Sequence, residues 1–209
     1  PELPVLVVLP GSRRSEVERL MDPFGDAVSL MWTAGRRFEV VIPTLPHVRP
    51  LVEAHLSHWP VRPHLVESEA DKHAAFRLAR AALAASGTVT LELALAGTPM
   101  VVAYKVDGLA VWLGRLLVKT PSVVLANLVL ERNAFPELLQ ESCTPDALAD
   151  AVARIMADTP ERAAQKAALA EIGPRLNQAP DGSLRGSPSR IAAAAVRSAG
   201  GLRNPAESR

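Results

Sequence analysis

The stretch from residue 82 to residue 105 constrains the fold more than any other part of the sequence. Small apolar residues lead into Ser86-Gly87-Thr88, after which apolar residues recur at helical spacing. A second break at residues 97–99 is followed by the β-branched run Val101-Val102. This order predicts a strand, a tight turn, a helix, another turn and a strand, which together form one βαβ unit with short connections.

The turn at residues 86–88 indicates where a ligand could bind. In a βαβ unit it lies at the carboxyl edge of a parallel sheet, where unpaired helical N–H groups and the helix dipole favour phosphate. Gly87 would let the backbone approach the ligand, and the hydroxyls of Ser86, Thr88 and Thr90 could add hydrogen bonds. Glu92, in the first turns of the helix, could reach a sugar hydroxyl. The residues leave an alternative open, in which Ser86 and Thr88 only cap the helix and Glu92 is a solvated partner of its dipole.

The turn at residues 10–13 is a second candidate phosphate site. Gly11 and Ser12 offer backbone and hydroxyl donors, and Arg13 could clamp a phosphate with two hydrogen bonds. In a doubly wound sheet this turn and the 86–88 turn open on the same edge, so one pyrophosphate could contact both. Neither turn matches GxGxxG or GxxxxGK[ST], which argues against a standard dinucleotide site or P-loop. The alternative is an ordinary capped turn with a solvated arginine.

A third candidate lies between residues 125 and 140. Asn127, Glu137 and Gln140 are polar residues among leucines, where burial without a hydrogen-bond partner would be costly. Glu137 and Gln140 are three residues apart, so we expect them on the same face of a helix. The alternative is a capped surface helix whose Glu and Gln side chains contact only water.

Strands and helices alternate along the rest of the chain, which predicts an α/β fold with a doubly wound parallel sheet. We expect strands at residues 5–9, 38–42, 65–66 and 122–125. We expect helices at residues 14–34, 47–58, 71–80, 108–119, 145–156 and 160–172, with Ser12 or Ser15 capping the first. Residues 178–188 are rich in Gly, Pro and Ser and predict a linker before an alanine-rich helix at 189–199.

The composition excludes several classes of function. Lys and Arg number 23 against 22 Asp and Glu, and aromatic residues make up 4%, so nothing favours a nucleic-acid partner. Cys143 is the single cysteine and fits a reducing compartment, and the five histidines offer no set of three metal ligands. No apolar run reaches the about 20 residues that a membrane-spanning helix needs. Because the first residue is Pro1, we expect a fragment or a processed chain.

Three segments together resemble the bacterial lipid-A-disaccharide synthases. They are LPGSRRSEV at residues 9–17, ASGTVTLELALAGTPMVVAYK at 85–105, and ANL at 126–128 with PELLQE at 136–141. The resemblance covers most of residues 3–157. It implies a GT-B glycosyltransferase that moves 2,3-diacylglucosamine from its UDP donor to the 6-hydroxyl of 2,3-diacylglucosamine 1-phosphate, with inversion and release of UDP. It also implies that no metal or cofactor takes part.

The family pattern implies a role for every candidate residue. The diphosphate would lie on the two turns, Glu92 would bind the ribose, and the third segment would complete the donor side. The implied donor site consists of Gly11, Ser12, Arg13, Ser86, Gly87, Thr88, Glu92, Asn127, Glu137 and Gln140. Ala126 stands where the family usually has a proline, and Leu130-Glu131 replaces a pair of small residues, so this loop would be less rigid.

The resemblance matches only the C-terminal, donor-binding domain of a GT-B enzyme. We expect residues 1–175 to form a UDP-sugar-binding Rossmann-like domain, and residues 176–209 to form a linker, a short helix and a frayed tail. The N-terminal acceptor domain and the catalytic residues would be absent from this chain. The expected partners are the UDP-linked donor, the lipid acceptor and the missing N-terminal domain.

The expected location is the cytoplasm, with peripheral contact at the inner face of the inner membrane. The apolar residues at 111–118, with Arg115 and Lys119 at their margin, would allow that contact, although burial against the sheet explains the same pattern. Two alternatives to this function stay open. One is another UDP-sugar enzyme, such as the muramyl-peptide N-acetylglucosaminyltransferase or a UDP-GlcNAc 2-epimerase. The other is a nucleotide-sugar-binding module without catalysis.

Overall fold

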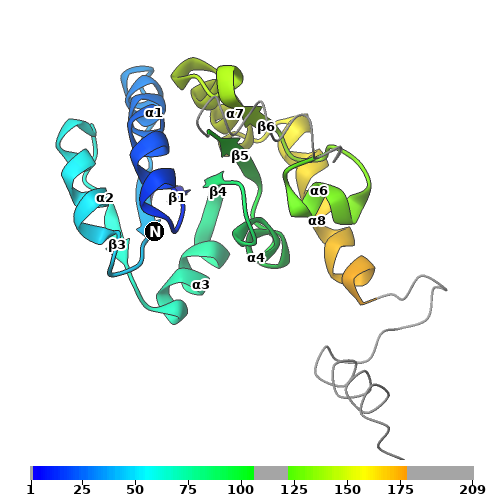
Figure 1. Ribbon diagram of the computed structural model, residues 1–209. Helices are drawn as coiled ribbons and strands as arrows, with labels where there is room; N and C mark the ends of the chain where they lie inside the picture. Colours follow the sequence, from blue (N-terminus) through cyan, green and yellow to red (C-terminus); the bar gives the residue numbers. More distant parts are fainter. Residues whose placement is uncertain (1, 106–121, 178–209) are drawn as a thin grey trace, which may run out of the picture. The chain divides into compact units, whose positions relative to one another are not determined.

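The computed structural model describes residues 2–105 and 122–177, and its centre is a six-stranded parallel sheet (Figure 1). The strand order is β3-β2-β1-β4-β5-β6, and every neighbouring pair is parallel. The strands are β1 (Val5–Leu9), β2 (Glu39–Pro43), β3 (His64–Val66), β4 (Ala79–Ala85), β5 (Met100–Tyr104) and β6 (Glu137–Leu139).

The helices of the described residues follow the strands in alternation. The α-helices are α1 (Arg14–Thr33), α2 (Arg49–His55), α3 (Glu69–Leu78), α4 (Val89–Leu95), α6 (Leu125–Leu130), α7 (Pro145–Met156) and α8 (Pro160–Leu176). Two short 3₁₀-helices, η1 (Leu56–His58) and η2 (Gln140–Ser142), complete the series.

Side chains of the central strand β1 alternate between two hydrophobic cores. All five of its residues are buried, which is typical of a parallel strand covered on both faces. Leu6 and Val8 pack in one core with α1, α2 and α7, and Val7 packs in the other with α3, α4, α6 and α8. These two layers of helices, visible on either side of the sheet in Figure 1, confirm the predicted doubly wound α/β fold.

The topology places a crevice between β1 and β4. These strands are neighbours in the sheet, and Leu9 at the end of β1 lies opposite Ala84 near the end of β4. The helices that follow them, α1 and α4, pack on opposite faces of the sheet. The chain therefore leaves the two strand ends in opposite directions. This place is the topological switch point, where ligands bind in open α/β sheets.

The predicted first helix and the helices at 145–156 and 160–172 are confirmed as α1, α7 and α8. Pro23 lies inside α1 without ending it. The predicted cap of α1 is wrong, because Arg13 is the N-cap residue and neither Ser12 nor Ser15 is. The Glu16 carboxylate accepts from the N-cap backbone instead, which is one half of a capping box.

The predictions for the third segment are partly wrong. Residues 122–125 are not a strand, since α6 begins at Leu125. Glu137 lies on strand β6, opposite Val102 of β5, while Gln140 begins η2 with a left-handed φ of 50°. The two side chains therefore do not share a helix face. Short apolar runs fit a strand or a helix equally well, and hydrogen bonding to β5 decided the outcome here.

Several expectations fall on residues outside the described ranges. These are the helix at 108–119, the apolar margin at 111–119, and the linker and helix between residues 178 and 199. In residues 2–105 and 122–177, no helix is both long and apolar enough to cross a membrane. The sheet and the helices up to residue Ile172 of α8 belong to one compact unit, and a second unit starts at Gly173, within α8. The assignment of residues 1–175 to a UDP-sugar-binding domain stays a prediction.

Candidate functional site

A cleft of about 380 Å³ lies at the carboxyl edge of the sheet. Its walls are the segments that follow β1, β2, β3 and β4, so it covers the switch point. Seven of the ten predicted site residues line it, namely Gly11, Ser12, Arg13, Ser86, Gly87, Thr88 and Glu92. The other three, Asn127, Glu137 and Gln140, are not among its lining residues. The structure thus brings both predicted phosphate turns together in the cleft, while the third segment does not line it.

The β1–α1 turn already holds an anion, which is the carboxylate of Glu16. The backbone N–H groups of Ser12 and Arg13 donate to Glu16 Oε2 at 2.9 and 3.1 Å, and Arg13 Nη1 lies 3.0 Å from Glu16 Oε1. Gly11 makes this turn with φ of +113°, which favours glycine. His47 Nε2 lies 3.0 Å from the Ser12 carbonyl oxygen and ties the turn to the segment after β2. The backbone donor predicted at Ser12 therefore binds an internal carboxylate in this structure, together with the N–H of Arg13.

The hydroxyls of the 86–88 turn differ in their roles. Ser86 Oγ donates to the Val123 carbonyl oxygen at 2.6 Å, so it links the turn to the segment before α6. Thr90 Oγ1 donates back to the Gly87 carbonyl oxygen at 2.8 Å. Thr88 is the N-cap residue of α4, is exposed, and makes no side-chain capping bond. The alternative for this turn, in which the Ser86 and Thr88 hydroxyls cap the helix, is therefore wrong.

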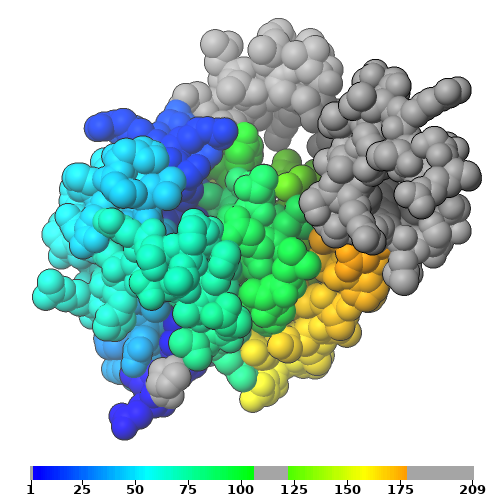
Figure 2. All heavy atoms as spheres, turned by 90° about the horizontal axis from the view of Figure 1, so that it is seen from below, coloured from blue at the N-terminus to red at the C-terminus, as the bar shows by residue number. Residues whose placement is uncertain are grey.

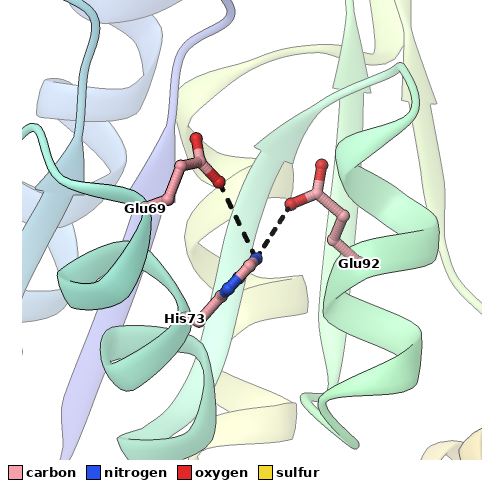
Figure 3. A group of neighbouring side chains, drawn as sticks. All are labelled: Glu69, His73 and Glu92. Carbon is pink, nitrogen blue, oxygen red and sulfur yellow. Dashed lines mark ion pairs between the residues drawn. The ribbon is translucent and has the colours of Figure 1, made fainter.

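Glu92 belongs to a charged cluster that joins α3 to α4. Lys72 Nζ lies 2.7 Å from Glu69 Oε2 and 2.9 Å from Glu92 Oε2, and His73 Nε2 lies 3.8 and 3.6 Å from the same two atoms. Figure 3 shows Glu69 and His73 on one helix and Glu92 on the next. In Figure 2 the corresponding turquoise and green segments lie side by side.

The electrostatics of this cluster keep Lys72 charged. Burial works to lower the pKa of Lys72, but its hydrogen bonds to Glu69 and Glu92 outweigh burial and raise the pKa above its ordinary value. The hydrogen bond from Lys72 likewise lowers the pKa of Glu69. Ligand atoms of Glu69, His73 and Glu92 lie within 4.8 Å of one another, as metal ligands do. A metal ion would have to displace the Lys72 ammonium from both carboxylates, so we assign none.

The third predicted segment forms a hydrogen-bond network outside the cleft. Asn127 is buried, and its Oδ1 accepts from the N–H groups of Ala134 and Phe135 at 2.9 and 3.0 Å. Its Nδ2 donates to the Phe135 carbonyl oxygen at 3.0 Å and to Glu137 Oε1 at 2.8 Å. Glu137 also accepts from Ser122 Oγ and from the N–H of Val123. Asn127 and Glu137 thus hold together the segments on either side of α6.

Comparison with known proteins identifies the family. A family model described as lipid-A-disaccharide synthetase matches residues 1–180. A lipid-A-disaccharide synthase of Rhodopseudomonas palustris (strain HaA2) is 52% identical over 164 residues, which are 78% of this chain and 42% of that protein. The chain belongs to the lipid-A-disaccharide synthase family. The synthase of Rhodospirillum centenum is 43% identical over 196 residues, 94% of this chain and 48% of its own length. This chain therefore spans less than half the length of both relatives.

Solved structures show the fold of this family member. A putative UDP-N-acetylglucosamine 2-epimerase from Listeria monocytogenes matches with a TM-score of 0.58 and 19% identity, over 97% of this chain and 46% of that one. A calicheamicin glycosyltransferase matches with a TM-score of 0.58 and 21% identity, over 98% and 44%. At these identities the likeness concerns the fold alone, and it is the fold of a GT-B glycosyltransferase domain.

The contacts of Glu16 and Lys72 in the cleft of this lipid-A-disaccharide synthase family member were not predicted from the sequence. The acceptor role of Glu16 has a local signal, because a Glu three residues after an N-cap is a capping-box position. Lys72 has no such signal. Its spacing to Glu69 fits a pair on one helix, but its contact with Glu92 is formed only when α3 and α4 take their places on the same face of the sheet.

Proposed function

We propose that this chain supplies the donor-binding half of a lipid-A-disaccharide synthase, and that its cleft binds the UDP part of the donor. The observation that carries the proposal is the cleft, because it gathers both phosphate turns and Glu92 at the switch point of the sheet. Membership in the synthase family supports the same reading.

In the proposed complex the diphosphate lies between the β1–α1 turn and the 86–88 turn. The side chain of Arg13 is 80% exposed, and its ion pair within residues 2–105 and 122–177 is with Glu16, so it can turn towards a phosphate at little energetic cost. The N–H groups of Ser12 and Arg13 become available only when Glu16 gives them up, because its carboxylate is their present acceptor. Binding is therefore a competition between Glu16 and the diphosphate.

The proposed reaction forms the disaccharide 1-phosphate and UDP. The 6-hydroxyl of 2,3-diacylglucosamine 1-phosphate attacks the anomeric carbon of the UDP-linked 2,3-diacylglucosamine, with inversion. The bond to the acceptor oxygen forms, the bond to UDP breaks, and a base takes the hydroxyl proton. Arg13 and the backbone donors of the turns would stabilise the negative charge that develops on the departing UDP.

We assign the base and the lipid-acceptor site to a part of the enzyme outside this sequence. The chain of 209 residues is then expected to bind UDP and to form no disaccharide by itself. Peripheral contact with the inner face of the inner membrane belongs to the same proposal, because both substrates carry acyl chains. An assay of this chain beside a protein of the relatives' full length tests the assignment, and comparable disaccharide formation by both would refute it.

A second candidate function is that of another UDP-sugar enzyme with the same fold. The specific observation in its favour is the fold match to the putative UDP-N-acetylglucosamine 2-epimerase. Family membership at 52% identity favours the synthase over this alternative. A donor assay that offers UDP-N-acetylglucosamine beside the acylated donor separates the two.

Replacement of Arg13 by alanine tests the site directly. A hydrogen bond to a charged group contributes about 1.5–3 kcal/mol, so Arg13→Ala is expected to weaken UDP binding about tenfold or more in titration calorimetry. The thermal midpoint should change little, since the side chain is exposed. Arg14→Ala is the matched control, because Arg14 is 77% exposed, pairs with Glu18 on the same helix and does not line the cleft. Equal affinities of wild type and a folded Arg13→Ala variant would remove Arg13 from the site.

A further inference from the structure

Lys72 connects two carboxylates that line the cleft. Its ammonium nitrogen contacts Glu69 on its own helix α3 and Glu92 on α4, at 2.7 and 2.9 Å. The side chain of Lys72 is only 19% exposed, whereas that of Glu69 is 70% exposed. A partly buried ammonium held between two carboxylates has a defined position, unlike an exposed lysine.

The other carboxylates of the cleft have cations of their own. Glu16 pairs with Arg13 at 3.0 Å, and Glu67 pairs with Arg49 at 2.8 Å. Glu69 and Glu92 share Lys72, with His73 farther away at 3.8 and 3.6 Å. Without the Lys72 ammonium, two neighbouring negative charges would repel each other and Glu92 would lose the contact that fixes its carboxylate.

In the described residues, two basic side chains contact Glu92, those of Lys72 and His73, and both contacts go to Oε2. Oε1 is therefore left as an acceptor for a ligand hydroxyl, and Glu92 itself lines the cleft. A carboxylate fixed at one oxygen presents the other in a defined direction, which reduces the ordering entropy that a ligand must overcome.

We propose that Lys72 is a positioning residue, which fixes the Glu92 carboxylate so that it can accept hydrogen bonds from the ribose of the nucleotide. This inference rests on the proposed function, because it requires UDP in the cleft. Lys72 itself need not touch the ligand, since two of its three N–H donors are engaged by Glu69 and Glu92.

A double-mutant cycle with two probes tests the proposal. UDP and inorganic pyrophosphate are titrated into the wild-type chain, Lys72→Met, Glu92→Gln and the double variant. Lys72→Met is expected to weaken UDP binding about tenfold and to change pyrophosphate binding less than about twofold, because pyrophosphate has no ribose. In the double variant the UDP affinity should equal that of Glu92→Gln alone, since Lys72 then has nothing to position.

The controls separate positioning from charge and from stability. Lys166→Met removes a lysine that contacts the Gly97 carbonyl oxygen at 3.2 Å and does not line the cleft, so it should leave UDP binding unchanged. Lys72→Arg keeps the cation and should retain more affinity than Lys72→Met. Lys72→Gln repeats the test if Lys72→Met does not fold.

Three outcomes would overturn the proposal. Additive losses in the cycle would show that Lys72 acts independently of Glu92. Equal loss of UDP and pyrophosphate affinity would show that Lys72 acts only through its charge, and unchanged UDP affinity in Lys72→Met would show no role. Absence of UDP binding by the wild-type chain would instead refute the proposed function, and this inference with it.

Discussion

Asn127→Ala is expected to lower the free energy of unfolding by about 3 kcal/mol, because it leaves buried polar groups without partners at about 1–3 kcal/mol each. The N–H groups of Ala134 and Phe135 both lose their acceptor, and Glu137 loses one of its donors. Asn127 is 1% exposed, so water cannot replace it without opening the loop. Urea unfolding at 25 °C measures the loss.

The matched control for this change is Asn133→Ala in the same loop. Asn133 is exposed, and its replacement should change the free energy of unfolding by less than about 0.5 kcal/mol, as is usual at surface positions. Similar losses for the two variants would show that the hydrogen bonds of Asn127 do not hold the loop. Because Asn127 does not line the cleft, a folded Asn127→Ala variant at low temperature should still bind UDP.

Gly11→Ala is expected to affect both stability and binding. A Cβ at Gly11 would lie 2.5 Å from the Cβ of Glu16 and closer still to its Oε2. The Cβ of Glu16 is fixed to helix α1, so the turn must move, and the φ of +113° adds strain. We expect a loss of about 2–3 kcal/mol in the free energy of unfolding. We also expect UDP binding to weaken more than about tenfold, because Ser12 and Arg13 are displaced with the turn.

Gly35→Ala isolates the backbone contribution to this effect. Gly35 also has a left-handed φ, +83°, but an added Cβ would meet no heavy atom within 4 Å. It should therefore lose only about 1 kcal/mol from conformational strain and keep wild-type UDP affinity. If the two variants lose the same free energy of unfolding, the contact with Glu16 does not contribute to the loss. If Gly11→Ala keeps full affinity, the β1–α1 turn is not part of the nucleotide site.

Local patterns in the sequence were sufficient for the elements around the switch point. The continuous apolar run of β1 and the helical spacing of α1 are properties of neighbouring residues, and both elements formed as predicted. The same holds for the breaks at Gly11 and Ser86-Gly87-Thr88, which became the two turns of the cleft. Parallel strand order then brings the two turns to one edge, because the carboxyl ends of parallel strands lie at the same edge of the sheet.

Other features were decided only by the tertiary structure. Residues 137–139 became strand β6 because β5 offered hydrogen-bonding partners that no local pattern reveals, and the 3₁₀-helix η2 follows at Gln140–Ser142. Three sets of contacts depend on where side chains lie after packing. They are the hydrogen bond between Asn127 and Glu137, the bonds from the Ser12 and Arg13 N–H groups to Glu16, and the contact of Lys72 with Glu92. By itself the sequence determined the fold class and the two turns that line the cleft, since hydrophobic periodicity and turn residues are local properties. The partners of these charged groups were decided by the placement of α3, α4 and α6 on one face of the sheet, because electrostatic contacts join residues that are distant along the chain.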